Sequence, residues 1–132
     1  MKANAGLWID HRKAIIAVRT DQGEEVGLIL SKTERQLTRA SGLKGTYDPR
    51  QLPAEDSRQR AFRKHLDMYY AAVSAYLRDA EAILIFGPGE AKNDLKKRLV
   101  KDKLGARIVG VEPADRMTER QVAAKVRKFF AK

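Results

Sequence analysis

The segment Ala82-Ile83-Leu84-Ile85-Phe86-Gly87-Pro88-Gly89-Glu90 decides the fold of this chain. Its first five residues form a continuous apolar run without polar alternation, which is typical of a strand that is covered on both faces. The run ends in a turn with two glycines, and a helical repeat of apolar residues starts directly after it. A buried strand that leads through a tight turn into a helix predicts an α/β architecture.

Three further strands are predicted before this segment. Residues 6–10 and 14–19 are rich in β-branched and aromatic residues, and the polar His11-Arg12-Lys13 separates them, which predicts a hairpin. The residues 20–23 suit a tight turn and lead into a third run at 25–31. We therefore expect an antiparallel meander of three strands at the start of the chain.

Three helices and a fifth strand complete the predicted order. Apolar residues follow the helical repeat from Ser57 to Leu77 and again after Glu90, and residues 106–111 form a β-branched run. A last helix is expected after Thr118, because Thr118 and Gln121 have the spacing of a capping box. The resulting order, β-β-β-α-β-α-β-α, predicts a ribonuclease-H-like mixed five-stranded sheet with helices packed on it.

The composition restricts the chain to one domain and excludes several kinds of site. A length of 132 residues with 43% hydrophobic residues fits a single domain over residues 1–132, in which residues 33–56 are predicted to be a long flexible loop. The absence of cysteine removes disulfides and thiolate chemistry. No apolar run approaches the roughly 20 residues that span a bilayer. We expect a cytoplasmic protein with no membrane partner and no cofactor.

The net charge of +10 predicts a polyanionic partner such as nucleic acid. Residues 91–132 hold thirteen Lys and Arg against five Asp and Glu, whereas residues 67–90 are net acidic. Two cationic clusters, one at the start of the helix after Ser57 and one on the helix after Glu90, are candidates for phosphate contacts. They comprise Arg58, Arg60, Arg63, Lys64, Lys92, Lys96, Lys97 and Lys101. The alternative is a solvated helix surface that keeps the protein soluble.

Three carboxylates keep a metal-dependent nuclease open as an alternative. Asp10 ends the first predicted strand, and Glu90 and Asp115 follow the fourth and fifth. Two-metal nucleases of this fold need carboxylates that converge at strand ends. Asp10-His11-Arg12 is equally well explained as a polar hairpin turn. Asp115 can likewise help to stabilise the start of the last helix. Tyr69 and Tyr70 lie in the apolar repeat and are expected in the core. No catalytic residue is assigned.

Several segments carry a resemblance to known proteins. They are Ser57-Arg58-Gln59-Arg60-Ala61-Phe62, Ile83-Leu84-Ile85-Phe86-Gly87 and Lys92-Asn93-Asp94-Leu95. They resemble the central domain of archaeal and eukaryotic class I peptide-chain release factors and of the ribosome-rescue protein Pelota. Residues 85–92 and 111–118 are also similar to segments of small bacterial single-domain relatives of these factors, a type labelled translational machinery proteins.

One departure from that family concerns its chemistry. Release factors carry a Gly-Gly-Gln loop before the helix that resembles the one after Ser57, and this chain has no Gly-Gly-Gln. The resemblance therefore implies a translation-associated module that binds the ribosome or tRNA, without peptidyl-tRNA hydrolase activity. Its expected partners are ribosomal RNA or tRNA. A protein-interaction module is a further alternative.

Overall fold

The computed structural model describes residues 3–31 and 55–131, and the side chains of residues 55–61 are outside this description. The flexible loop predicted for residues 33–56 therefore lies outside the described residues, apart from its last two positions. Those two positions begin a helix, because helix α2 starts at Glu55.

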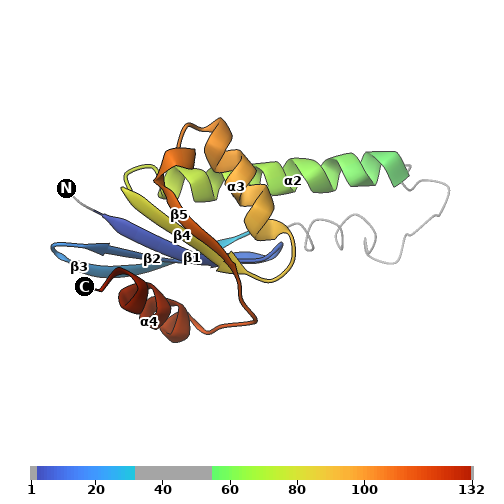
Figure 1. The fold of residues 1–132 in the computed structure, drawn as a ribbon. Coiled ribbons are helices and arrows are strands. Elements are labelled where there is room, and N and C mark those ends of the chain that lie inside the picture. Colours follow the sequence, from blue (N-terminus) through green and yellow to red (C-terminus); the bar gives the residue numbers. More distant parts are fainter. Residues whose placement is uncertain (1–2, 32–54, 132) are drawn as a thin grey trace.

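A mixed five-stranded sheet forms the centre of the molecule, as predicted (Figure 1). Its strands are β1 (Asn4–Ile9), β2 (Lys13–Thr20), β3 (Gly23–Leu30), β4 (Ala82–Gly87) and β5 (Ile108–Pro113). The strand order is β3-β2-β1-β4-β5. β2 pairs antiparallel with both β1 and β3, whereas β4 pairs parallel with both β1 and β5. The predicted meander and the later crossovers are both confirmed.

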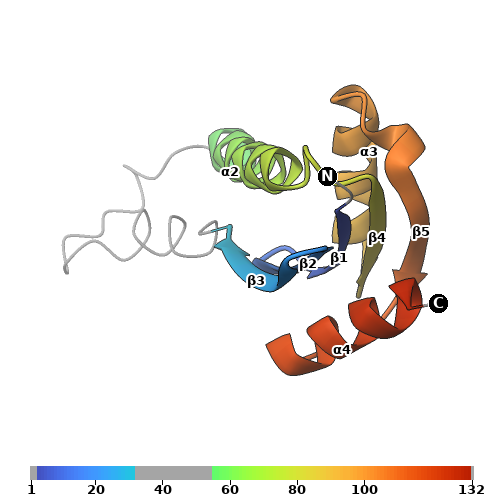
Figure 2. The ribbon, with the colours of Figure 1, turned by 90° about the vertical axis from the view of Figure 1, so that its left-hand side faces the viewer.

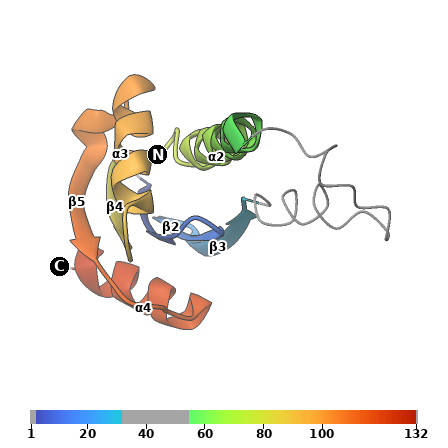
Figure 3. The same cartoon turned by 90° about the vertical axis from the view of Figure 1, so that its right-hand side faces the viewer.

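In the described part of the chain, three α-helices cover the two faces of the sheet. α2 (Glu55–Tyr76) and α3 (Ala91–Lys101) pack on one face, and α4 (Glu119–Phe130) packs on the other (Figures 2 and 3). The predicted capping box is present, since the Thr118 side chain accepts from the Gln121 N–H and the Gln121 side chain accepts from the Thr118 N–H. Within residues 3–31 and 55–131, no helix is long and apolar enough to cross a membrane.

Strand β4 contributes to the hydrophobic core on both sides of the sheet. Ile83 and Ile85 lie in the larger core cluster with residues of α2 and α3, and Leu84 and Phe86 lie in the second cluster with Val122 of α4. All four β4 side chains are fully buried. The continuous apolar run is therefore explained by burial on two faces, as the sequence predicted.

The segment before β5 differs from its prediction. Residues 105–107 form the short 3-10 helix η2 (Gly105–Arg107), and β5 begins only at Ile108. The Arg107 guanidinium donates to the carbonyl oxygens of Arg78 (2.6 Å) and Ala80 (3.0 Å), in the connection between α2 and β4. These two bonds hold the backbone of η2 beside that connection. The apolar pattern of residues 106–111 gives no sign of these long-range bonds.

The turn after β4 depends on a glycine. Gly87 has a φ of 152°, and a Cβ atom at this position would lie 2.2 Å from the carbonyl oxygen of Ile9. Only glycine accommodates both the backbone conformation and the close approach. Gly87 therefore allows the chain to leave the sheet beside the end of β1 and to start α3.

Helix α3 ends in a Schellman motif with a lysine at the left-handed position. The Leu104 N–H donates to the Leu99 carbonyl (2.7 Å), and the Lys103 N–H donates to the Val100 carbonyl (3.0 Å). Lys103 has a φ of 68°, and it is the only non-glycine residue with positive φ in the described part of the chain. Glycine is the residue that this position favours.

We expect the substitution Lys103→Gly to stabilise the protein by about 0.5–1 kcal/mol, because it removes the steric cost of the left-handed conformation. Urea unfolding followed through the fluorescence of Trp8 measures this change. Lys103→Ala is the matched control, since it removes the same charge and leaves the Cβ atom in place. Equal stabilities of the glycine and alanine variants would contradict this explanation.

Candidate nucleic-acid interface

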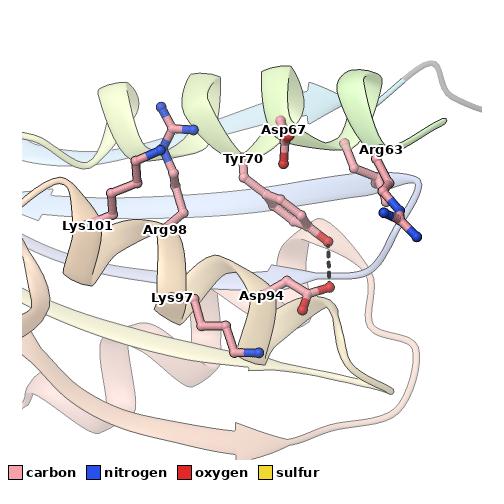
Figure 4. A pocket seen from close by; sticks show the side chains of 8 residues that line it. Arg63, Asp67, Tyr70, Asp94, Lys97, Arg98 and Lys101 are labelled. Atoms are coloured by element: carbon pink, nitrogen blue, oxygen red, sulfur yellow. Dashed lines mark hydrogen bonds between the residues drawn. The ribbon is translucent and has the colours of Figure 1, made fainter. Parts of the chain in front are cut away.

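A groove of about 410 Å³ lies between helices α2 and α3 (Figure 4). We call it the α2/α3 groove. Four of its lining side chains are cationic, two are acidic, and Tyr70 and Leu66 complete the lining. The lining residues are Arg63, Leu66, Asp67, Tyr70, Asp94, Lys97, Arg98 and Lys101.

Both walls of the α2/α3 groove follow the same helical spacing. The α2 wall consists of residues 63, 66, 67 and 70, and the α3 wall consists of residues 94, 97, 98 and 101. Positions i, i+3, i+4 and i+7 share one side of an α-helix. Each helix therefore presents one continuous stripe of side chains to the groove, adjacent to the apolar stripe that it buries.

The cations of the groove differ in how they are paired. The Arg98 Nε atom lies 3.0 Å from Asp102 Oδ2, in an ion pair one helical turn apart. Arg63, Lys97 and Lys101 form no ion pair or hydrogen bond with any of the described residues. These three side chains are therefore available to an anion that enters the groove.

At one end of the groove, polar contacts connect α2 to α3 and to the β1–β2 hairpin. The Tyr70 hydroxyl donates to Asp94 Oδ2 (3.4 Å), and His11 Nε2 lies 3.8 Å from the same oxygen. The neighbouring Tyr69 hydroxyl donates to the Asp10 carbonyl (3.0 Å). Burial raises the pKa of both tyrosines, and the Asp94 carboxylate raises the pKa of Tyr70 further. Both hydroxyls therefore remain protonated donors at neutral pH.

At the other end, a buried serine connects the two helices. The Ser74 hydroxyl of α2 donates to Asp102 Oδ2 (2.6 Å), the oxygen that also accepts from Arg98. The hydrogen bonds from Ser74 and then Arg98 lower the pKa of the Asp102 carboxyl. The groove is thus fixed by polar contacts between its helices at both ends.

The structure brings together part of the two cationic clusters singled out from the sequence. Arg63 of the first cluster and Lys97 and Lys101 of the second line the same groove. Lys64 and Lys96 are exposed on α2 and α3 outside the groove lining, and the Lys92 ammonium donates to the Gly89 carbonyl. The backbone of residues 58 and 60 lies in α2, and the side chains of Arg58 and Arg60 are outside the described part.

Sequence reasoning missed five members of the groove. They are Leu66, Asp67, Tyr70, Asp94 and Arg98. The signal that finds them is the matching i, i+3, i+4, i+7 pattern that starts at Arg63 and at Asp94, next to the apolar stripe of each helix. A search for cations alone overlooks the two aspartates.

Tyr69 and Tyr70 belong to the core, as predicted. Only 3% of Tyr69 and 5% of Tyr70 is exposed, and the two rings contact each other with their centroids 5.3 Å apart. Among the described aromatic side chains, the exposed ones are Tyr76 and Phe129, and neither lines the groove. The groove therefore offers charge and hydrogen-bonding groups without an exposed ring on which a base can stack.

The three carboxylates considered for a metal site do not form such a site. Within residues 3–31 and 55–131, no group of three His, Cys, Asp or Glu side chains is placed to hold a metal ion. Asp10 instead caps the hairpin, since its Oδ1 atom accepts from the backbone N–H groups of Arg12 and Lys13, each at 2.8 Å. Glu90 accepts from the Asn93 side chain, and the Asp115 carbonyl accepts from Trp8. The hairpin-turn interpretation of Asp10 is confirmed.

Comparisons with known proteins give structural similarity alone. No family model matches the sequence, and no curated protein matches it. Among solved structures, the chain is similar to the Pelota protein of Thermoplasma acidophilum, with a TM-score of 0.58 and 16% identity over 92% of this chain and 30% of that one. The chain shares the fold of that part of Pelota.

The chain is similar to two further solved structures. Pelota of Archaeoglobus fulgidus has a TM-score of 0.57 and 16% identity, covering 97% of this chain and 31% of its own. The archaeal translation termination factor aRF1 has a TM-score of 0.57 and 13% identity, covering 96% of this chain and 34% of its own. The chain thus spans about a third of the length of each of these proteins. Their fold agrees with the fold that the sequence resemblance implied.

We expect the protein to lose stability when the pH falls below about 4. The folded-state pKa of Asp102 is lowered, so its stabilising contribution is complete above its ordinary pKa and is lost as the pH falls through the lowered value. In Ser74→Ala the largest cause of this lowering is removed, and the difference in stability between pH 7 and pH 3 should decrease. Urea midpoints at the two pH values measure it. An unchanged difference would show that the Ser74 bond does not set the Asp102 pKa.

Proposed function

We propose that this protein is a release-factor-like module of the translation machinery that binds ribosomal RNA or tRNA through the α2/α3 groove. The observation that carries the proposal is the convergence of Arg63 from α2 with Lys97 and Lys101 from α3 in one groove. These cations come from two helices that are well separated in the chain, and none of the three forms an ion pair within 4 Å of a carboxylate among the described residues.

The chemistry of the groove suits the phosphates of a nucleic-acid backbone. Each lysine or arginine that contacts a phosphate releases condensed counterions, so binding weakens as the salt concentration rises. Base reading would require groups directed at base edges or exposed rings for stacking, and the described lining has no such ring. The module is therefore proposed to recognise RNA by its backbone.

The structural neighbours support the translation part of the proposal. One of them is a translation termination factor by name, and two are Pelota proteins. This chain has no Gly-Gly-Gln, so the proposal includes no peptidyl-tRNA hydrolysis. The module is proposed to act by occupying an RNA site, and the whole ribosome is its proposed larger partner.

The variant with Arg63→Ala, Lys97→Ala and Lys101→Ala tests the groove as a unit. With total tRNA in an electrophoretic mobility titration, we expect the dissociation constant to rise at least tenfold at low salt. We also expect the slope of log affinity against log salt to become shallower by about two, as three phosphate contacts are lost.

The matched control is the variant with Arg116→Ala, Arg120→Ala and Lys128→Ala. These three exposed cations belong to α4 and the segment before it, so the control removes the same charge from the other side of the sheet. Its affinity should change only slightly. Equal losses in the two variants would assign binding to net charge, and a lack of tRNA binding by the native protein would refute the proposal.

A second candidate function, docking of another protein, is favoured by strand β3. Among the described strands, β3 lies at an edge of the sheet, and the apolar side chains of Val26, Leu28 and Leu30 are 41–54% exposed. Exposed apolar side chains along an open sheet edge are suited to strand addition by a partner. Co-sedimentation with ribosomes that persists in high salt and is lost in Leu28→Lys would favour this alternative over RNA binding.

A further inference from the structure

The α2/α3 groove contains one carboxylate that its structure does not explain. Asp67 is exposed on α2, four residues after Arg63, and its side chain has no hydrogen bond or ion pair with the described residues. Figure 4 shows the Asp67 side chain on the α2 wall, between those of Tyr70 and Arg63. The other lining carboxylate, Asp94, already accepts a hydrogen bond from the Tyr70 hydroxyl.

A free carboxylate is unfavourable in a surface that binds only phosphates. It repels the phosphate oxygens and partly cancels the attraction of Arg63 and Lys97. A carboxylate is, however, a strong acceptor, and a hydrogen bond from a hydroxyl to an ionised acceptor is stronger than one between neutral groups. The groove therefore combines donors suited to phosphates with an acceptor suited to a hydroxyl group.

RNA supplies that hydroxyl beside each phosphate. The ribose 2′-OH is the group by which a protein distinguishes RNA from DNA, and it can donate a hydrogen bond while the adjacent phosphates accept from cations. We propose that Asp67 makes the groove selective for RNA by accepting a hydrogen bond from a 2′-OH, while Arg63, Lys97 and Lys101 hold the flanking phosphates. This inference rests on the proposed function, because it names the contact by which the same groove would select RNA over DNA.

The absence of an exposed ring in the groove lining favours a duplex as the ligand. Double-stranded RNA is recognised mostly by its shape and by contacts to phosphates and 2′-OH groups, whereas single strands are usually held by stacking on aromatic rings. The test therefore uses a short RNA duplex. Its comparison ligand is the duplex of the same sequence with 2′-O-methyl groups throughout, which keeps the phosphates and lacks the 2′-OH donor.

The experiment compares the native protein with Asp67→Ala on both duplexes by fluorescence anisotropy at low salt. Native protein should bind the unmodified RNA about five- to tenfold more tightly than the methylated RNA, as expected for one hydrogen bond to an ionised acceptor at an accessible site. In Asp67→Ala this ratio should fall to about one. Alanine favours the helix at this exposed position, and Trp8 fluorescence verifies that the variant is folded.

The control is Glu119→Ala, which removes one exposed carboxylate from the first turn of α4, on the other side of the sheet. This variant should keep the native ratio. If Asp67→Ala instead binds both duplexes more tightly by the same factor, Asp67 is only a repulsive charge and the inference is wrong. A native ratio of one, or a ratio that persists in Asp67→Ala, also refutes it. If the native protein binds tRNA but neither duplex, the inference is wrong and the proposed function stands; if it binds neither tRNA nor either duplex, both fail.

Discussion

The burial of strand β4 on both of its faces is the constraint on which the rest of the structure depends. Ile83 and Ile85 require a cover on one face, and Leu84 and Phe86 require one on the other. Helices α2 and α3 supply the first cover together, so they must lie side by side on one face of the sheet. Their apolar stripes are used in the core, and the adjacent stripes of polar side chains therefore face each other across the α2/α3 groove.

Polar contacts between α2 and α3 fix the two helices relative to each other at both ends of the groove. Ser74 and Asp102 connect the helices at one end, and Tyr70 and Asp94 connect them at the other. Asp102 is paired with the Arg98 guanidinium, and Asp94 accepts a hydrogen bond from the Tyr70 hydroxyl. Arg63, Lys97, Lys101 and Asp67 form no ion pair or hydrogen bond with the described residues. This combination of groups is the basis for proposing an RNA backbone as the ligand.

The sequence predicted the architecture well because its elements are defined by local patterns. The apolar run of β4, the hairpin at residues 11–13 and the capping box at Thr118 each depend on neighbouring residues. The 3-10 turn at Gly105–Arg107 was not predicted, because it depends on hydrogen bonds from Arg107 to residues nearly thirty positions away.

The candidate site was predicted only in part for the same reason. The two cationic clusters were visible in the sequence, but their meeting in one groove depends on how α2 and α3 pack against the sheet. The roles of Asp67 and Asp94 also depend on that packing, since an isolated aspartate on a helix is ordinary. The carboxylates considered for a metal site followed strands on the same edge of the sheet, and local hydrogen bonds of the hairpin and the α3 turn explain two of them.

Amide chemical-shift mapping with a short RNA duplex tests the central claim most directly, because it locates the ligand on the folded protein. The account predicts that the largest shifts fall on the groove-facing residues of α2 and α3, with small shifts on α4. Shifts centred on α4 or on the edge strand β3, with the groove residues unchanged, would contradict it.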